Sequence, residues 1–176
     1  MRDVVIVDSV RTGLTKAFRG SFNLTRSDDL LAHCIDSLLD RNPQLGPDEV
    51  EDVYVGAASH AGEQDGNLAR LAVVLSKLPI TAAGVTINRF CSSGLQTIAM
   101  AAQRIIAGEG DVYIAGGVES ISCVQQEMNK HMLADPSLLK IKPEIDFLPG
   151  KQAGVTLVTR WQQVWQRVDN TKRDNK

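Results

Sequence analysis

The sequence has 176 residues, of which 43% are hydrophobic and 23% are charged, and its formal net charge at pH 7 is -2. This size and composition predict one soluble globular domain with a sizeable core. The charge gives no reason to expect nucleic acid or an anionic membrane as a partner, and no apolar run approaches the roughly 20 residues that a membrane span needs. Three cysteines without metal-type spacing, Cys34, Cys91 and Cys123, indicate free thiols, no metal site and a reducing compartment such as the cytoplasm.

The first half of the chain predicts two strands and two helices. The apolar run Val4–Val7 is expected to form a buried strand that the chain enters at once, without a signal or transit peptide. A long polar loop follows, and Ser27 is the expected N-cap of a helix that runs to about Arg41, with Cys34 on its apolar face. A short strand at Val53–Val55 and a polar loop lead to a helix at 67–78, which Pro79 ends.

The next stretch predicts a strand at 84–90, a helix after Cys91 and a strand at 111–117. Gly108 is the expected C-cap of this helix, and its many alanines suggest close packing in a buried position. The resulting order is β-α-β-α-β-α-β. Strands that alternate with helices of this length indicate an α/β layered domain with a mostly parallel sheet.

Cys91 lies between a strand and a helix, in the segment INRFCSSGLQ at 87–96. Reactive groups of open α/β sheets gather at such junctions, and the N-terminus of a helix favours a thiolate. Ser92, Ser93 and Gly94 are small enough to let a ligand approach, and the backbone N–H groups of the turn could hold an oxyanion. The alternative is that Cys91 is only a small buried residue, since cysteine is among the most buried residue types. Position alone leaves both interpretations open.

INRFCSSGLQ closely resembles the nucleophile segment of thiolases, the acetyl-CoA acyltransferases and acetyltransferases. Other stretches resemble the family in the right order, over about residues 1–148: VIVDSVRTGLTKAFRGSF, GEQDGNLAR, DVYIAGGVESIS and MNKHMLADPSLLKIKPEI. A β-ketoacyl synthase, a relative that also uses a cysteine, would not be expected to contain GGVESIS, and a condensing enzyme of that type is the remote option.

The resemblance implies a thiolase-like layered fold and acyl transfer between 3-ketoacyl-CoA and CoA, by thiolytic cleavage or by condensation, through a thioester on Cys91. It implies CoA thioesters as substrates, no bound cofactor, and a dimer or tetramer of identical chains. The Cys91 N–H would contribute to an oxyanion site. Four further residues would shape the active-site floor by packing: Gly116, Gly117, Glu119 and Ser120.

The resemblance has two gaps. The activating His of a G-H-P motif, the second Cys of a C-x-G motif and the Asn of an N-E motif belong to the family's second half, and none of His33, His60 and His131 stands in a matching motif. The first 150 residues carry 13 Lys and Arg against 19 Asp and Glu, whereas residues 151–176 carry six against two and both tryptophans.

The extent of the resemblance and the change in composition near residue 150 predict three segments: an N-terminal α/β domain at 1–122, the start of a loop domain at 123–150, and an atypical basic tail at 151–176. They also predict a truncated acyltransferase that is inactive alone and that works as a homo-oligomer or with a complementary C-terminal half. The competing hypothesis is a non-catalytic remnant that acts as an oligomerisation or CoA-binding module.

Overall fold

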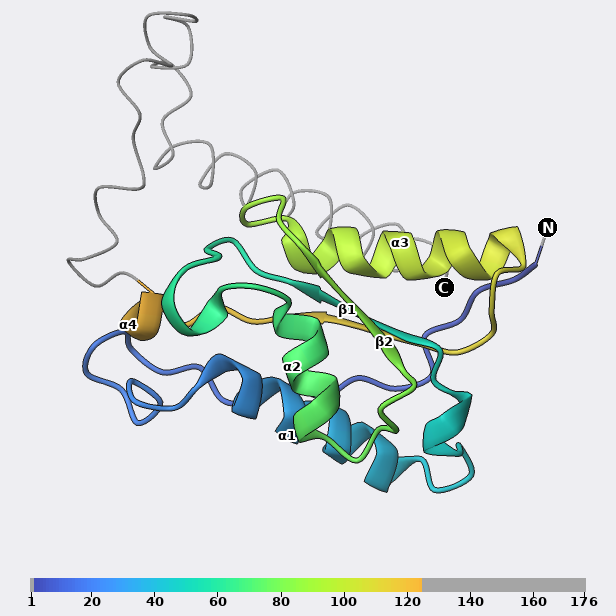
Figure 1. Cartoon of the computed structure of the whole chain (residues 1–176), viewed down its shortest axis with the longest axis horizontal. Helices are drawn as coiled ribbons and strands as arrows, with labels where there is room; N and C mark the ends of the chain where they lie inside the picture. Colours follow the sequence, from blue (N-terminus) through green and yellow to red (C-terminus); the bar gives the residue numbers. More distant parts are fainter. Residues whose placement is uncertain (1, 125–176) are drawn as a thin grey trace, which may run out of the picture. The chain divides into compact units, whose positions relative to one another are not determined.

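The computed structural model describes residues 2–124, which form a three-stranded sheet with helices on both faces (Figure 1). The predicted alternation of strands and helices from Ser27 onward is confirmed. In chain order the elements are α1 (Ser27–Arg41), the 3-10 helix η1 (Pro47–Glu49), β1 (Asp52–Gly56), the 3-10 helix η2 (Gly62–Gln64), α2 (Leu68–Leu75), β2 (Ala83–Ile87), α3 (Ser93–Ala107), β3 (Tyr113–Gly117) and α4 (Ile121–Val124).

The three strands are parallel and lie in the order β2-β1-β3. All five residues of the central strand β1 are buried, as expected for a strand covered on both faces. The register places Gly56 opposite Ile87 on one side and Gly117 on the other. The carboxyl ends of the strands therefore lie side by side, and the segments that follow them meet at one edge of the sheet.

The helices form two layers around the sheet. Helix α3 contacts β1 and β3 on one face, while α2 covers β1 and β2 on the other face and packs against α1 (Figure 1). The side chains between α1, α2 and the sheet form the hydrophobic core. It consists of Leu31, Ile35, Leu39, Val50, Val53, Val55, Ala57, Leu68, Ala69, Ala72, Val73, Leu78 and Ala82.

Of the expected helix ends, one is confirmed and two differ. Gly108 ends α3 in the left-handed conformation at φ 77°. Helix α2 is capped by Asn67, which accepts a hydrogen bond from the Arg70 N–H at 3.1 Å, but the helix ends at Leu75 and not at the expected residue 78. Ser27, however, is not an N-cap but the first residue of α1. Its buried hydroxyl donates instead to Gln64 Oε1 at 2.8 Å, so a tertiary contact replaces the local one.

Val4–Val7 is not a strand, which corrects the expected β-α-β-α-β-α-β order at its first element. Val5, Ile6 and Val7 are each at least 75% exposed. Both edges of β1 are occupied, and no ladder joins this segment to β2 or β3 among the described residues. An apolar run becomes a strand only where its backbone N–H and C=O groups find partners.

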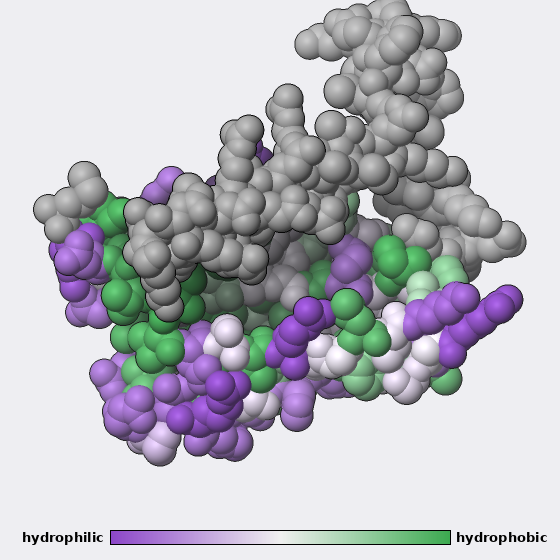
Figure 2. All heavy atoms as spheres, turned by 180° about the vertical axis from the view of Figure 1, so that it is seen from behind, coloured by the Kyte–Doolittle hydropathy of each residue, from purple (hydrophilic) through white to green (hydrophobic). Residues whose placement is uncertain are grey.

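Figure 2 shows the molecule from behind, where green apolar side chains lie among purple polar ones on the surface.

Apart from Cys123 and Val124, the predicted segment 123–150 lies outside the described residues, as do the predicted tail 151–176, His131 and both tryptophans.

Candidate active site

Three segments meet at the carboxyl edge of the sheet, and they carry the site residues expected from the sequence. Residues 57–60 follow β1, the turn 88–92 follows β2, and residues 118–120 follow β3. Because β1 lies between the other two strands, its loop is a neighbour of both segments. The topology therefore brings the Cys91 turn to the same edge as the Gly116–Ser120 segment.

Cys91 occupies the turn directly before α3, whose first residue is Ser93. It is exposed, whereas Cys34 is half-buried and Cys123 is buried. The interpretation of Cys91 as a small buried residue is therefore wrong. Of the three thiols, Cys91 is the one that a reagent in solution can reach at the end of a helix.

The approach of α3 to the sheet depends on glycines. A Cβ on Gly117 would lie 3.0 Å from Gly56 O and 3.3 Å from the Gly94 Cα. The backbone of α3 therefore passes very close to the ends of β1 and β3. Two residues with side chains in this place would separate α3 from the sheet and move the turn that carries Cys91.

Gly116 is held to the same helix by a side chain. The hydroxyl of Thr97, which is fully buried, lies 3.0 Å from Gly116 O and 2.6 Å from Gly94 O. Gly116 and Gly117 thus both adjoin the first turns of α3, on the side of the helix that faces the sheet. Their packing beneath Cys91 itself stays a prediction.

Glu119 and Ser120 face the loop after β1, through a buried glutamine. Gln64 Oε1 accepts hydrogen bonds from Ser27 Oγ at 2.8 Å and from Ser120 N at 2.7 Å, and its Nε2 donates to Ser59 O and Glu119 Oε1, both at 2.8 Å. Gln64 is 0% exposed; its bonds to Ser27 and Ser120 are buried, and its bonds to Ser59 and Glu119 are partly buried. Sequence reasoning missed this residue, although its loop, GEQDGNLAR, belongs to the motifs quoted above.

A chain of hydrogen bonds leads from this network to the turn before Cys91. Glu119 Oε2 accepts from the Ala58 N–H at 2.7 Å, and Ala58 O accepts from Asn88 Nδ2 at 3.0 Å. Asn88 Oδ1 in turn accepts from the Phe90 N–H at 2.9 Å. The segment after β3 is thus connected through the loop after β1 to the residue that precedes Cys91.

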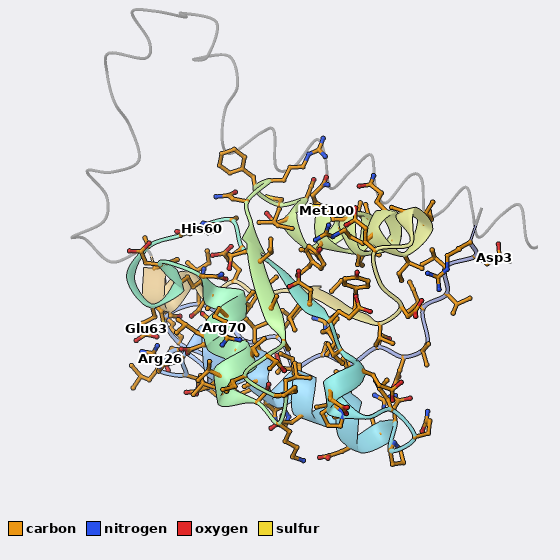
Figure 3. All side chains as sticks on the ribbon, turned by 45° about the vertical axis from the view of Figure 1, so that its right-hand side comes forward. Asp3, Arg26, His60, Glu63, Arg70 and Met100 are labelled. Carbon is orange, nitrogen blue, oxygen red and sulfur yellow. The ribbon has the colours of Figure 1, made fainter. Side chains whose placement is uncertain are left out.

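The two histidines within residues 2–124 lie elsewhere. His33 is exposed on α1. His60, labelled in Figure 3, lies in the loop after β1, where its Nε2 is 3.1 Å from Ala57 O. Neither histidine forms a hydrogen bond with Cys91. His131 lies outside the described residues.

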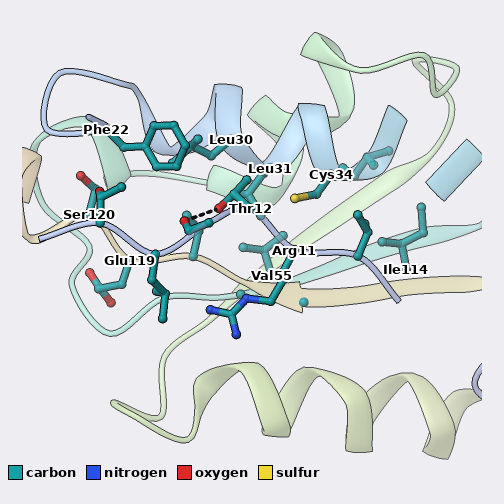
Figure 4. A pocket seen from close by; sticks show the side chains of 18 of the residues that line it. Arg11, Thr12, Phe22, Leu30, Leu31, Cys34, Val55, Ile114, Glu119 and Ser120 are labelled. Carbon is teal, nitrogen blue, oxygen red and sulfur yellow. Dashed lines mark hydrogen bonds between the residues drawn. The ribbon is translucent and has the colours of Figure 1, made fainter. Parts of the chain in front are cut away.

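A cavity of about 430 Å³ lies on the opposite face of the sheet from α3, between α1, the segment 10–17 and the strands (Figure 4). Arg11, Leu31 and Cys34 are among the residues that line it, and Cys91 is not. Burial raises the pKa of the Cys34 thiol, and a hydrogen bond from the Thr12 backbone opposes the rise. This burial favours the protonated thiol of Cys34, which is a weaker nucleophile than a thiolate.

Within residues 2–124, no three His, Cys, Asp or Glu side chains gather in a way that could hold a metal ion. Over the same residues, no helix combines the length and the apolar character needed to cross a membrane.

The sequence of the chain matches one family. Residues 4–155 match the sequence profile of the thiolase N-terminal domain, so the chain belongs to the thiolase family. A 3-ketoacyl-CoA thiolase of Idiomarina loihiensis is 42% identical over 124 residues, which are 70% of this chain and 32% of that protein. A 3-oxoadipyl-CoA/3-oxo-5,6-dehydrosuberyl-CoA thiolase of Escherichia coli K12 is 45% identical over 130 residues, 74% of this chain and 32% of that protein.

A 3-ketoacyl-CoA thiolase of Vibrio vulnificus is 36% identical over 164 residues, which are 89% of this chain and 42% of that protein. The chain therefore spans about a third to two fifths of the length of these curated relatives. The parallel α/β sheet and the acyltransferase family agree with the expectations drawn from the sequence.

Proposed function

We propose that this chain supplies the nucleophile half of a thiolase-type acyltransferase that acts on CoA thioesters. The observation that carries the proposal is the exposed thiol of Cys91, which lies in the turn before the 15-residue helix α3. The relatives named as 3-ketoacyl-CoA thiolases support a 3-ketoacyl-CoA as substrate.

The reaction has two halves. The Cys91 thiolate attacks the keto carbonyl of the 3-ketoacyl-CoA, the carbon–carbon bond next to that carbonyl breaks, and the released acetyl-CoA carbanion takes up a proton. The acyl group stays on sulfur as a thioester. The thiolate of CoA then attacks this thioester, and the bond to Cys91 breaks to give the acyl-CoA and the free thiolate. Condensation is the same sequence in reverse.

The residues around the turn have distinct roles in this proposal. The Cys91 N–H contributes to an oxyanion site for the tetrahedral intermediates. Gly117 lets α3 approach the sheet, and Gly116 O accepts a hydrogen bond from the Thr97 hydroxyl of that helix. Glu119 and Ser120 hold the neighbouring loop through Gln64. We infer that groups outside residues 2–124 carry the proton, because neither His33 nor His60 forms a hydrogen bond with Cys91. Residues 2–124 alone would therefore turn over slowly or not at all.

Exposed apolar side chains on α3 support an oligomeric enzyme. Leu95, Ile98 and Ile106 are each 41–42% exposed. We infer that a second copy of this chain or a complementary C-terminal half covers them, because apolar side chains gathered on one helix favour association. Light scattering with size-exclusion chromatography tests this, and a monodisperse monomer with a cooperative melt would contradict it.

The three free thiols support a reducing compartment, for which we propose the cytoplasm.

Acylation of Cys91 tests the chemistry directly. The full chain is incubated with acetyl-CoA or acetoacetyl-CoA, and the acetyl group is located by peptide mass spectrometry. We expect the adduct on Cys91 and none in Cys91→Ala, which keeps Cys34 and Cys123 as internal controls. An unmodified Cys91 at alkaline pH, where thiolates form freely, would overturn the proposal and leave the non-catalytic CoA-binding or oligomerisation module as the function.

A further inference from the structure

The residue before the nucleophile has an unfavourable backbone conformation. Phe90 has a φ of 49°, in the left-handed region that bulky side chains rarely adopt. Its side chain is 74% exposed, so packing in the core does not hold it there. Such a conformation persists only where surrounding contacts determine it. The contacts that do so must act on the backbone of Phe90.

Two side chains make these contacts, and we call them the Phe90 clamp: Asn88 and Ser93. Asn88 Oδ1 accepts a hydrogen bond from the Phe90 N–H at 2.9 Å. On the other side, Phe90 O lies 3.0 Å from the Ser93 N–H and 2.6 Å from the Ser93 hydroxyl. The same hydroxyl accepts from the Arg89 N–H at 2.8 Å. Side chains thus hold both peptide groups that flank Phe90.

Asn88 differs from Ser93 in how it is itself fixed. Ser93 is 3% exposed and lies within α3, so it moves only with the helix. Asn88 is exposed, and its Nδ2 donates to Ala58 O at 3.0 Å, which ties it to the loop after β1. Asn88 therefore makes one bond to Phe90 and one to a separate segment. It determines where the turn lies relative to the rest of the site.

We propose that Asn88 is a positioning residue for Cys91, acting through the left-handed Phe90. The inference rests on the proposed role of Cys91 as the nucleophile. Without Asn88, the Phe90 N–H loses its partner and φ returns to negative values. The chain then leaves the turn in another direction, and the sulfur moves away from the N–H groups that would hold the oxyanion. The thiol stays exposed and able to react with small reagents, but it is no longer placed for acyl transfer.

The test compares four forms of the full chain. They are the wild type, Asn88→Ala, the double variant Asn88→Ala/Phe90→Gly, and the matched control Asn42→Ala. Asn42 also makes two side-chain hydrogen bonds, to Asp8 Oδ2 at 3.0 Å and to Leu38 O at 2.9 Å, but at the far end of α1. Glycine at 90 adopts a positive φ freely, so the double variant restores the turn without Asn88.

Three readouts are measured: exchange of the residue 90 amide hydrogen, acetylation of Cys91 by acetyl-CoA, and alkylation of each cysteine by iodoacetamide. We expect Asn88→Ala to speed the amide exchange and to slow acetylation, each by about fivefold or more, as for the loss of one hydrogen bond. Alkylation of Cys91 should stay within about twofold of the wild type, because the exposed thiol needs no positioning. The double variant should recover most of the acetylation rate, and Asn42→Ala should change none of the three readouts.

Acetylation at the wild-type rate in Asn88→Ala, or no recovery in the double variant, would overturn the inference. Rapid alkylation of the buried Cys123 in Asn88→Ala would show that this variant is unfolded. In that case Asn88→Asp, which keeps the acceptor for the Phe90 N–H, is used as the test. Slow amide exchange in Asn88→Asp supports the inference, and fast exchange in a folded Asn88→Asp contradicts it. If the wild type is not acetylated at all, the proposed function fails, while the amide exchange still decides whether Asn88 holds Phe90.

Discussion

Gly56 lies against the backbone of Ser93, so that a Cβ on Gly56 would be 2.4 Å from the Ser93 carbonyl carbon. The next nearest atom, Gly94 N, would be 2.6 Å away. Both are backbone atoms of the first turn of α3 and cannot rotate aside. The end of the central strand thus sets the height of α3 above the sheet, and with it the place of the Cys91 turn.

We expect Gly56→Ala to destabilise the fold by roughly 2 kcal/mol or more, because the added methyl forces α3 away from the sheet. Denaturant unfolding followed by circular dichroism measures the change. Gly116→Ala is the matched control, since nothing lies within 4 Å of a Cβ at that position. Equal stabilities of the two variants would show that α3 is not held by this contact.

The three cysteines should differ in reactivity at neutral pH. Cys91 is exposed, while burial raises the pKa of Cys34 and Cys123 is buried. We expect iodoacetamide to modify Cys91 first, Cys34 more slowly and Cys123 only after unfolding. Time-resolved peptide mass spectrometry orders the three sites. Modification of Cys34 before Cys91 would contradict the exposures on which the candidate site depends.

Much of this fold could be predicted because its signals are local. Short apolar runs predict the three strands, Gly108 stands at the end of a helix, and the place of Cys91 between a strand and a helix is readable from its neighbours. A parallel order of strands then brings their carboxyl ends together. The edge that carries the candidate site therefore follows from the sequence.

What could not be predicted depends on partners that are distant in the chain. Val4–Val7 has the composition of a buried strand, but no strand pairs with it among residues 2–124. Ser27 has the signature of a helix cap, yet its hydroxyl bonds to Gln64, 37 residues away. Gln64 itself lies in a polar loop, where nothing local distinguishes a buried glutamine from a solvated one.

Gln64→Leu should be strongly destabilising, although leucine fills a similar volume. The change removes all four hydrogen bonds of the buried amide and leaves the buried Ser27 hydroxyl and the Ser120 N–H without partners. We expect a loss of about 3 kcal/mol in the free energy of unfolding, since each unpaired buried polar group costs about 1–3 kcal/mol. Gln103→Leu, on the exposed side of α3, is the control. A loss in Gln64→Leu no larger than in this control would refute the buried network.

Asp52, the first residue of β1, carries a buried carboxyl group and is 8% exposed. Burial raises the pKa of its carboxyl group, and a hydrogen bond from the Val53 N–H at 2.8 Å opposes the rise. The folded state thus binds the proton more tightly than the unfolded state does. The contribution of Asp52 to stability is therefore present below its unfolded pKa and is lost as the pH rises through the folded pKa.

Asp52→Asn removes this dependence while keeping an oxygen that can accept from the Val53 N–H. We expect the variant to be more stable than the wild type at pH 7, by about 1 kcal/mol at most, and the difference to shrink toward pH 3, where Asp52 is neutral in both states. Urea unfolding at several pH values measures the difference, with the exposed Asp65→Asn as the control for the change in net charge. An advantage of Asp52→Asn that grows as the pH falls would have the wrong sign and would refute the burial of this carboxylate.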